Sequence, residues 1–315
     1  MVVKMKIKLE KFKCFEKSNM EFKSINLLSG KNSIGKSSIL DAIEIFHNIR
    51  DAEINLFSKG KSDTDFLIWD GFDSEELFFK ISIDGIKKTH KRDKRNPNRL
   101  ILEPKSITKR VIRIKANRLI SEEQVTGLPN RVSMESNNNI YHILKCNKTL
   151  LDEINNSLNV IFGNMNFKLE INKFGEDKVF YECKYGSKSI DNSGFGIKFI
   201  LPILINCFIS NEKIILIENP EIHLHPEAQS KLMEILIDVN IRNGNTLFIE
   251  THSDHIINAF RKAIYFNDSN QVGIYYLKDF LLKEIKIKNG RYSEFTDGFL
   301  DQGKKDFEEI LNDEL

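Results

Sequence analysis

The stretch SINLLSGKNSIGKSSIL, residues 24–40, joins three different kinds of local sequence. The apolar residues before Gly30 are typical of a short buried strand that ends in glycine. After the glycine-rich segment, Ile39, Ile43 and Phe46 follow the spacing of one face of an α-helix. The order of strand, glycine-rich loop and helix indicates the first unit of an α/β protein.

The glycine-rich segment itself fits the pattern G-x-x-x-x-G-K-[ST], with Gly30, Gly35, Lys36 and Ser37 at the fixed positions. Two glycines allow the backbone to curl with its N–H groups toward phosphate oxygens, and the helix that follows adds its positive dipole end. Lys36 is expected to reach the β- and γ-phosphates, and the Ser37 hydroxyl to ligate magnesium. The predicted nucleotide contacts are Gly30, Lys31, Asn32, Ser33, Ile34, Gly35, Lys36, Ser37 and Ser38.

Composition limits the remaining classes of protein. The chain has 315 residues, 41% of them hydrophobic and 29% charged, which is ordinary for one large or two modest soluble domains. A net charge of +2 means that any nucleic-acid binding must depend on a local patch. The apolar runs are too short to span a membrane, and the N-terminus has no signal-peptide core, so we expect a cytoplasmic protein without a membrane partner. The scattered cysteines indicate reduced thiols.

The pattern of apolar residues along the chain predicts strands and helices in alternation. The period-2 pattern of residues 5–22 indicates a β-hairpin or two edge strands, and strands are also expected between residues 66 and 115. Residues 141–162 are predicted as a helix and residues 167–186 as a hairpin. The C-terminal half alternates buried strands with helices, which favours a parallel sheet; these elements are expected at residues 194–210, 213–218, 226–244, 245–251, 253–265, 273–278 and 283–292.

The sequence IILIENPEIHLHP, residues 214–226, places a carboxylate where a buried strand ends. Many ATPases present a magnesium ligand in this way, which makes Glu218 the candidate. The next position is where a second carboxylate would activate water, and it holds Asn219. An amide can orient water but cannot accept its proton, so hydrolysis is expected to be slow. Glu221, two residues further on, is the alternative base.

Two further motifs follow the same order. Ser193, Gly194 and Gly196 precede a predicted helix, an arrangement that suits an anion. The sequence THS, with His252 at its centre, follows the next buried strand. Together with the phosphate loop, this series resembles an ABC-type ATPase head, and more narrowly the SMC/RecF-like and OLD-like small ATPases often labelled "AAA family ATPase". The end of the chain resembles a short C-terminal domain of unknown function found in one branch of that family.

The resemblance implies a fold and a division into domains. The fold class is α/β, a P-loop NTPase of the ABC-ATPase head type, with a mixed sheet that has a parallel core and with flanking antiparallel strands and helices. The head would span residues 1–265, with residues 60–190 as an insert region, and residues 266–315 would form a short β/α extension. Two subunits would enclose ATP and Mg²⁺ head to tail, with Ser193 and Gly194 of one subunit facing the γ-phosphate held by the other.

The resemblance also implies roles for single residues. Glu218 aligns with the magnesium-coordinating acid, Asn219 with the catalytic glutamate, and His252 with the histidine that senses the γ-phosphate. Lys13 lies where such heads approach the adenine. The chain departs from the pattern in two places, since residues 66–72 contain no glutamine for a magnesium-linked loop and Phe195 replaces a signature glycine.

Alternatives remain for two groups of residues. His223, His225, His252 and His255 have a spacing that could also ligate zinc. The segment Lys87–Arg118 is rich in bases, which suits either a solvated hairpin or a sequence-independent contact with a DNA backbone.

The family resemblance implies a sensor or regulatory subunit that dimerises on ATP and serves a partner effector. Such ATPases frequently occur in anti-phage defence, where the effector is a nuclease or another toxin. A RecF-like DNA-repair ATPase and a scaffold that binds ATP without hydrolysing it are the rival functions.

Overall fold

The computed structural model describes the main part of the chain, residues 5–48, 78–92, 100–103, 111–116, 143–163, 168–171, 179–183, 186–189, 194–266, 270–293, 299–300 and 309. It divides into two compact units, the first formed by Met1–Val111 with Phe260–Leu315 and the second by Ile112–Ala259. Several predictions fall outside the described residues: Ser193, the missing glutamine at residues 66–72, most of the 60–190 insert and of the basic segment beyond residue 92, and the C-terminal residues 301–308 and 310–315.

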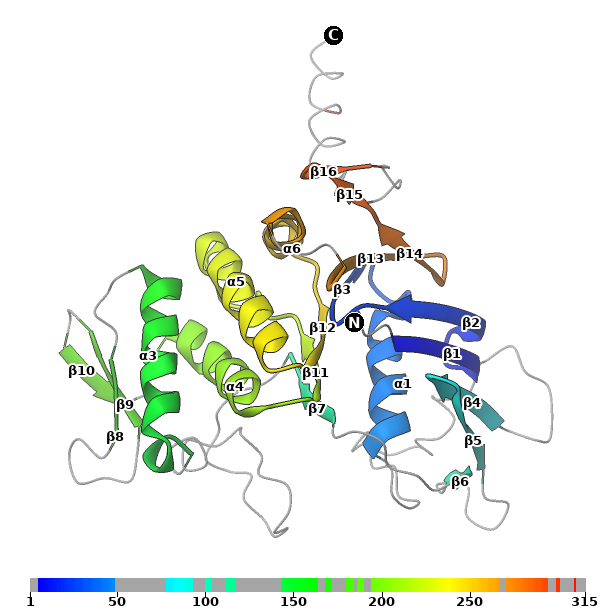
Figure 1. The fold of residues 1–315 in the computed structure, drawn as a ribbon, viewed down its shortest axis with the longest axis horizontal. Helices are drawn as coiled ribbons and strands as arrows, with labels where there is room; N and C mark the ends of the chain where they lie inside the picture. Colours follow the sequence, from blue (N-terminus) through cyan, green and yellow to red (C-terminus); the bar gives the residue numbers. More distant parts are fainter. Residues whose placement is uncertain are drawn as a thin grey trace. The chain divides into compact units, whose positions relative to one another are not determined.

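An antiparallel sheet in the first unit confirms the strands expected near the N-terminus. Its order is β2-β1-β4-β5-β6 (Figure 1), formed by β1 (Met5–Phe12), β2 (Phe15–Phe22), β4 (Phe78–Ile83), β5 (Ile86–Arg92) and β6 (Leu100–Glu103). In the register, Leu9 of β1 lies opposite Ile81 of β4, and both side chains are completely buried. The period-2 alternation therefore gives this sheet one apolar face and one polar face.

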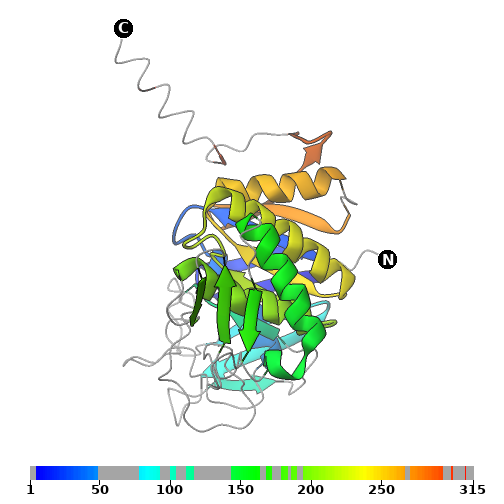
Figure 2. The same ribbon diagram turned by 90° about the vertical axis from the view of Figure 1, so that its left-hand side faces the viewer.

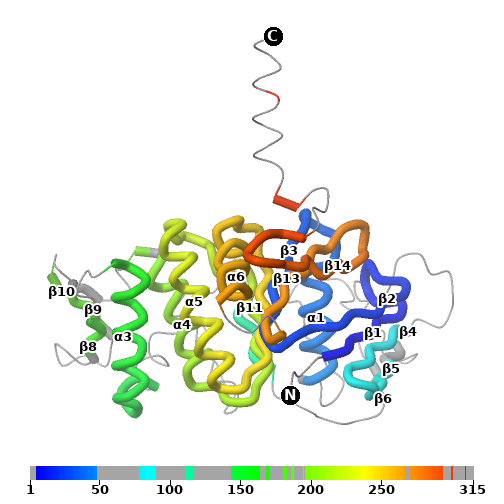
Figure 3. Tube along the Cα trace, turned by 45° about the horizontal axis from the view of Figure 1, so that its top comes forward, coloured from blue at the N-terminus to red at the C-terminus, as the bar shows by residue number. Residues whose placement is uncertain are grey.

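The strand that leads into the phosphate loop, β3 (Ile25–Gly30), is buried along its whole length. It pairs in parallel with β13 (Val272–Lys278), which pairs antiparallel with β14 (Leu281–Ile285) (Figure 3). The helix α1 (Lys36–Asn48) begins directly after the loop, so the predicted order of strand, loop and helix is confirmed. The short strands β15 (Ile287–Lys288) and β16 (Arg291–Tyr292) form a separate two-stranded ribbon.

The second unit contains the other predicted parallel strands. Strand β11 (Ile214–Glu218) pairs in parallel with β12 (Thr246–Glu250), and β7 (Val111–Ile114) lies on its other side. Glu218 is in register with Glu250, so the two strands end at the same level. The four apolar residues of β11 have no exposed surface, because a strand covered on both faces must be apolar throughout. Mixed parallel and antiparallel pairing confirms the predicted fold class.

Helices accompany these strands in the order that the sequence predicts: α3 (Lys148–Phe162), α4 (Phe195–Ile209), α5 (Pro226–Arg242) and α6 (Asp254–Phe266). Figures 1 and 2 show α3 beside the small antiparallel sheet formed by β8 (Lys168–Ile171), β9 (Val179–Cys183) and β10 (Gly186–Ser189). Helix α5 is followed by its C-cap residue Asn243, and Gly244 adopts a positive φ of 64°, as expected for a glycine that follows a helix. Among the described residues, no helix has the length and apolar character needed to cross a bilayer.

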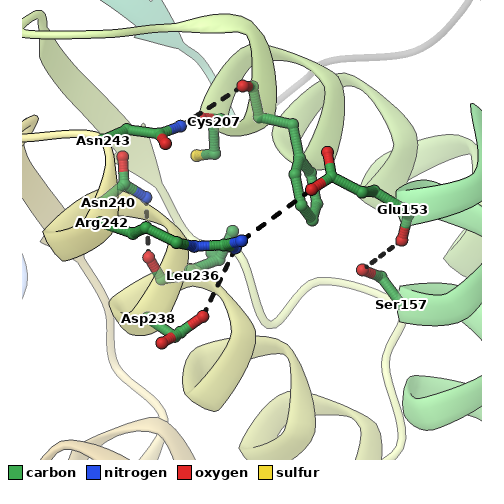
Figure 4. Close-up of polar contacts among 9 residues, drawn as sticks. Glu153, Ser157, Cys207, Leu236, Asp238, Asn240, Arg242 and Asn243 are labelled. Atoms are coloured by element: carbon green, nitrogen blue, oxygen red, sulfur yellow. Dashed lines mark hydrogen bonds and ion pairs between the residues drawn. The ribbon is translucent and has the colours of Figure 1, made fainter. Parts of the chain in front are cut away.

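Polar contacts join three of these helices (Figure 4). The Asn243 amide donates to the Cys207 carbonyl at 3.2 Å, near the C-terminal end of α4. Arg242 forms ion pairs with Asp238 at 3.5 Å on its own helix and with Glu153 of α3 at 3.9 Å. The last carbonyls of a helix have no hydrogen-bond partner within the helix. The Asn243 amide therefore supplies a donor to a carbonyl at the end of α4.

The structure differs from the sequence-based prediction at two places. Residues 143–146 are helical, but the predicted helix is interrupted at Asn147, whose side chain accepts a hydrogen bond from the Leu150 amide at 3.0 Å and caps α3. Lys88 belongs to the basic segment predicted either as a solvated hairpin or as a DNA contact, but it is completely buried and donates to the Phe46 carbonyl at 2.5 Å. Its ammonium also lies 4.6 Å from the centre of the Phe46 ring, and burial lowers its pKa. The burial of Lys88 is a tertiary effect, whereas the cap at Asn147 is a local contact, and the hydrophobic period of the sequence reveals neither.

Candidate nucleotide-binding site

The phosphate loop of the first unit adopts backbone conformations that require particular residues. Gly30 has a φ of 145° and Gly35 a φ of 102°. A Cβ atom on Gly30 would lie 2.5 Å from the Leu277 carbonyl oxygen, and one on Gly35 would lie 2.5 Å from Cys14 Sγ. Both glycines are therefore required by close packing as well as by backbone conformation. Ser33, between them, also has a positive φ of 61°.

Lys36 is held at the centre of this loop. Its residue is only 3% exposed, and its ammonium donates to the carbonyls of Gly30 at 3.0 Å and of Lys31 at 2.6 Å. Ser37, in contrast, is exposed at the first turn of α1. A buried cation, a glycine cradle and a helix N-terminus form a donor set that suits the phosphates of a nucleotide. The residues present therefore fit the phosphate groups that the sequence motif implies.

The turn between β1 and β2 contacts the phosphate loop and the start of α1. Lys13, with a φ of 49°, forms an ion pair with Asp41 of α1, and both side chains are largely buried. The thiol of Cys14 is directed toward Ser38 Oγ at 3.9 Å and lies against Gly35. Desolvation raises the pKa of this thiol, so it remains protonated at neutral pH. Lys13 was predicted near the adenine; the structure shows its ammonium engaged by Asp41.

At the end of β11, in the second unit, Glu218 is paired with an arginine that the sequence analysis missed. Arg113 of β7 directs Nε and Nη2 at the same carboxylate oxygen, Oε1, at 2.7 and 2.6 Å. The backbone N–H of Ala116 lies 3.4 Å from the other oxygen, Oε2. Arg113 was interpreted only as part of a predicted strand and of the basic segment Lys87–Arg118, and the sequence carries no signal that distinguishes it from its basic neighbours.

The residues after Glu218 form a second, connected arrangement. Asn219 has a φ of 43°, a region that asparagine enters more readily than most residues, and its amide donates to Glu221 Oε1 at 3.2 Å. The backbone N–H of His252 donates to the same oxygen at 3.1 Å. Glu221 Oε2 is buried and has no hydrogen-bond partner among the described residues. The structure thus brings Asn219, Glu221 and the His252 backbone together, and the catalytic roles of these residues stay a prediction.

The histidines near these residues have structural contacts. His225 Nδ1 accepts a hydrogen bond from the Glu227 backbone N–H at 3.4 Å, at the start of α5. The His223 ring packs edge-on against the Phe199 ring, with 4.9 Å between the ring centres. In the described part of the chain, no group of three or more His, Cys, Asp or Glu side chains is arranged to hold a metal ion. The zinc alternative therefore has no support from the four described histidines. The side chain of His252 is exposed.

The start of α4 packs against the loop that follows β11. Gly194 occupies the N-cap position and is exposed, and no side chain caps the helix there. A Cβ atom on Gly194 would have open space around it, whereas one on Gly196 would lie 3.2 Å from the His223 carbonyl oxygen. The glycine at position 196 is therefore needed for packing, and the glycine at position 194 leaves the helix N-terminus accessible.

Comparisons with solved structures support the fold. The Smc head bound to the C-terminal winged-helix domain of ScpA matches with a TM-score of 0.56 and 12% identity, over 90% of this chain and 97% of that chain. The Smc head with an extended coiled coil, bound to the C-terminal domain of ScpA from Pyrococcus furiosus, matches with a TM-score of 0.50 and 13% identity, over 99% of this chain and 100% of that chain. At these identities the likeness shows the fold alone.

The comparison of sequences gives a more specific result. No curated protein sequence matches the chain. The family described as "AAA ATPase domain" matches residues 4–162 and 107–257, which together extend over most of the chain and include both the phosphate loop and the end of β11. Together with the Smc-head fold and the glycine cradle around Lys36, this match shows that the chain belongs to the AAA ATPase domain family.

Proposed function

We propose that this protein binds ATP with Mg²⁺ in its phosphate loop, dimerises around the nucleotide and hydrolyses it slowly. The observation that carries the proposal is the buried Lys36 ammonium at the centre of the loop, between two glycines whose Cβ positions are occupied by neighbouring atoms. The family match supports the same nucleotide. Ser37 and Glu218 are the proposed magnesium ligands, since a hydroxyl and a carboxylate are donors that Mg²⁺ prefers. The metal would neutralise charge on the phosphates.

We infer that Glu221, rather than Asn219, takes the proton from the attacking water. Glu221 Oε1 is fixed by the Asn219 amide and the His252 backbone N–H, and Oε2 is buried without a partner among the described residues. A buried carboxylate oxygen without a hydrogen-bond partner lowers the stability of the fold. Its presence therefore suggests that it serves a function. Asn219 then orients the base. Turnover is expected to be slow because this base lies two residues beyond position 219, where such ATPases carry the carboxylate that activates water.

The dimer follows from the ABC-type head and from the accessible start of α4, where Ser193, Gly194 and Gly196 would face the γ-phosphate of the other subunit. Smc heads of the same fold are bound to a partner protein, ScpA, which favours a partner for this chain as well. We propose that this partner is an effector, a nuclease or another toxin, whose action depends on the ATP-bound dimer. Anti-phage defence is the setting in which such pairs are expected.

Gly194 provides a direct test of the dimer. Its Cβ position is open and its φ of −58° suits any residue, so Gly194→Asp is expected to fold normally. The added carboxylate would repel a γ-phosphate at the helix N-terminus. Light scattering should therefore show an ATP-dependent dimer for the parent protein and for the control Gly194→Ala, and a monomer that still binds ATP for Gly194→Asp. A dimer of unchanged stability in Gly194→Asp would contradict the head-to-tail arrangement.

A second function, contact with a DNA backbone, is favoured by the polar face of the first sheet. The Lys80 ammonium lies 3.0 Å from Glu10 and lowers the pKa of that carboxyl, and Lys87 and Lys17 add to the effect. A single glutamate thus has three lysines around it, and Lys8, exposed on the same strand as Glu10, extends the positive charge. This surface would suit a RecF-like repair ATPase.

The DNA contact is tested by replacing three exposed lysines, Lys8, Lys17 and Lys87, by alanine. Each lost phosphate contact should reduce the slope of log affinity against log salt by about 0.9, so the triple variant should bind duplex DNA more weakly and with a shallower slope. Fluorescence anisotropy over a salt series measures both. Lys231→Ala, which removes a half-exposed lysine from α5 in the second unit, is the control. Absence of DNA binding by the parent protein at low salt would exclude this function.

A further inference from the structure

The pairing of Arg113 with Glu218 has a consequence for metal binding. Both nitrogens of the arginine converge on Oε1, and the two side chains are only 8% and 17% exposed. An ion pair with so little exposed surface is weakly screened by solvent and salt. Glu218 is the carboxylate proposed above as a magnesium ligand. Because it is paired with Arg113, its negative charge is already balanced by a cation of the protein itself.

The backbone after β7 is held by the same carboxylate. The Ala116 N–H faces Oε2 at 3.4 Å, which is longer than a normal N–H···O hydrogen bond. Both oxygens of the Glu218 carboxylate thus face donors of the protein itself. A divalent cation that binds Glu218 therefore meets a guanidinium that is already bound to Oε1.

We propose that Arg113 is a positioning residue that competes with Mg²⁺ for Glu218, so that metal binding must loosen the contact between the end of β7 and the end of β11. The arginine holds the carboxylate in place, and its charge lowers the affinity of the site for a divalent cation. The site would thus favour the metal only when a nucleotide supplies further oxygen ligands. This inference rests on the proposed role of Glu218 in ATP and Mg²⁺ binding.

Manganese binding measured by electron paramagnetic resonance, with ATP present at saturation, tests the competition without any measurement of turnover. Removal of a unit positive charge within a few ångströms should strengthen Mn²⁺ binding on the order of tenfold in Arg113→Met. Arg113→Lys, which keeps the charge and loses the planar fork, should stay close to the parent protein. Arg242→Met is the matched control, because this arginine pairs with Asp238 and Glu153 and not with Glu218 (Figure 4).

The outcomes separate this inference from the function on which it rests. Unchanged or weaker Mn²⁺ binding in a folded Arg113→Met protein would overturn the competition. Arg113→Gln, which removes the charge but keeps polar donors, decides the question if Arg113→Met fails to fold, as judged by its thermal unfolding curve. Mn²⁺ binding that is unchanged in Glu218→Gln would show instead that Glu218 is not a metal ligand. If the parent protein does not bind ATP, the proposed function itself is refuted.

Discussion

The Glu221→Gln variant is expected to hydrolyse ATP about 10²–10⁴-fold more slowly than the parent protein, which is the usual contribution of a general base. Glutamine keeps the size of the side chain and an oxygen that can accept from Asn219 and His252. It cannot take a proton from water, so chemistry should fail while binding survives. Single-turnover phosphate release at saturating ATP measures the effect, and ATP affinity measured separately should be unchanged.

The control for this variant is Glu227→Gln, which alters an exposed glutamate in the first turn of α5 and should leave phosphate release unchanged. Asn219→Glu separates the two candidate positions of the base. It places a second carboxylate beside Glu221 and removes the amide donor, and it puts glutamate at a φ of 43° that asparagine tolerates better. We therefore expect no gain in turnover. Faster hydrolysis in Asn219→Glu, together with normal hydrolysis in Glu221→Gln, would assign the base position to residue 219.

The second large effect is on nucleotide affinity. Lys36→Ala should lower the affinity for ATP at least about tenfold, or ~1.4 kcal/mol, because the buried ammonium is the cation at the centre of the phosphate loop. Titration calorimetry measures this change directly. The matched control is Lys31→Ala, since Lys31 lies on the same loop and its exposed side chain can be removed while its backbone carbonyl remains. Equal affinities in the parent and Lys36→Ala would refute the phosphate-binding assignment.

Much of the fold could be predicted from the sequence because the signals are local. The period-2 pattern before residue 22, the apolar runs of β3, β11 and β12, and the helical spacing after Ser37 depend on neighbours within a few residues. The phosphate loop is local in the same sense, since its glycines, lysine and serine lie within eight positions of one another. Backbone conformation and phosphate chemistry restrict which residues can occupy these positions. Both restrictions can be recognised in a short stretch of sequence.

What only the tertiary structure decided involves residues far apart in the chain. Arg113 reaches Glu218 across 105 positions, and Lys88 reaches the end of α1 across 42, so neither pairing leaves a pattern in the sequence around it. The break at Asn147 was missed because an asparagine can either continue a helix or cap the next one, and the choice depends on packing. The sequence by itself therefore determined that this protein has the phosphate loop of an ATPase. The partners of Glu218 and Glu221 depended on side chains that only folding brings within hydrogen-bond distance.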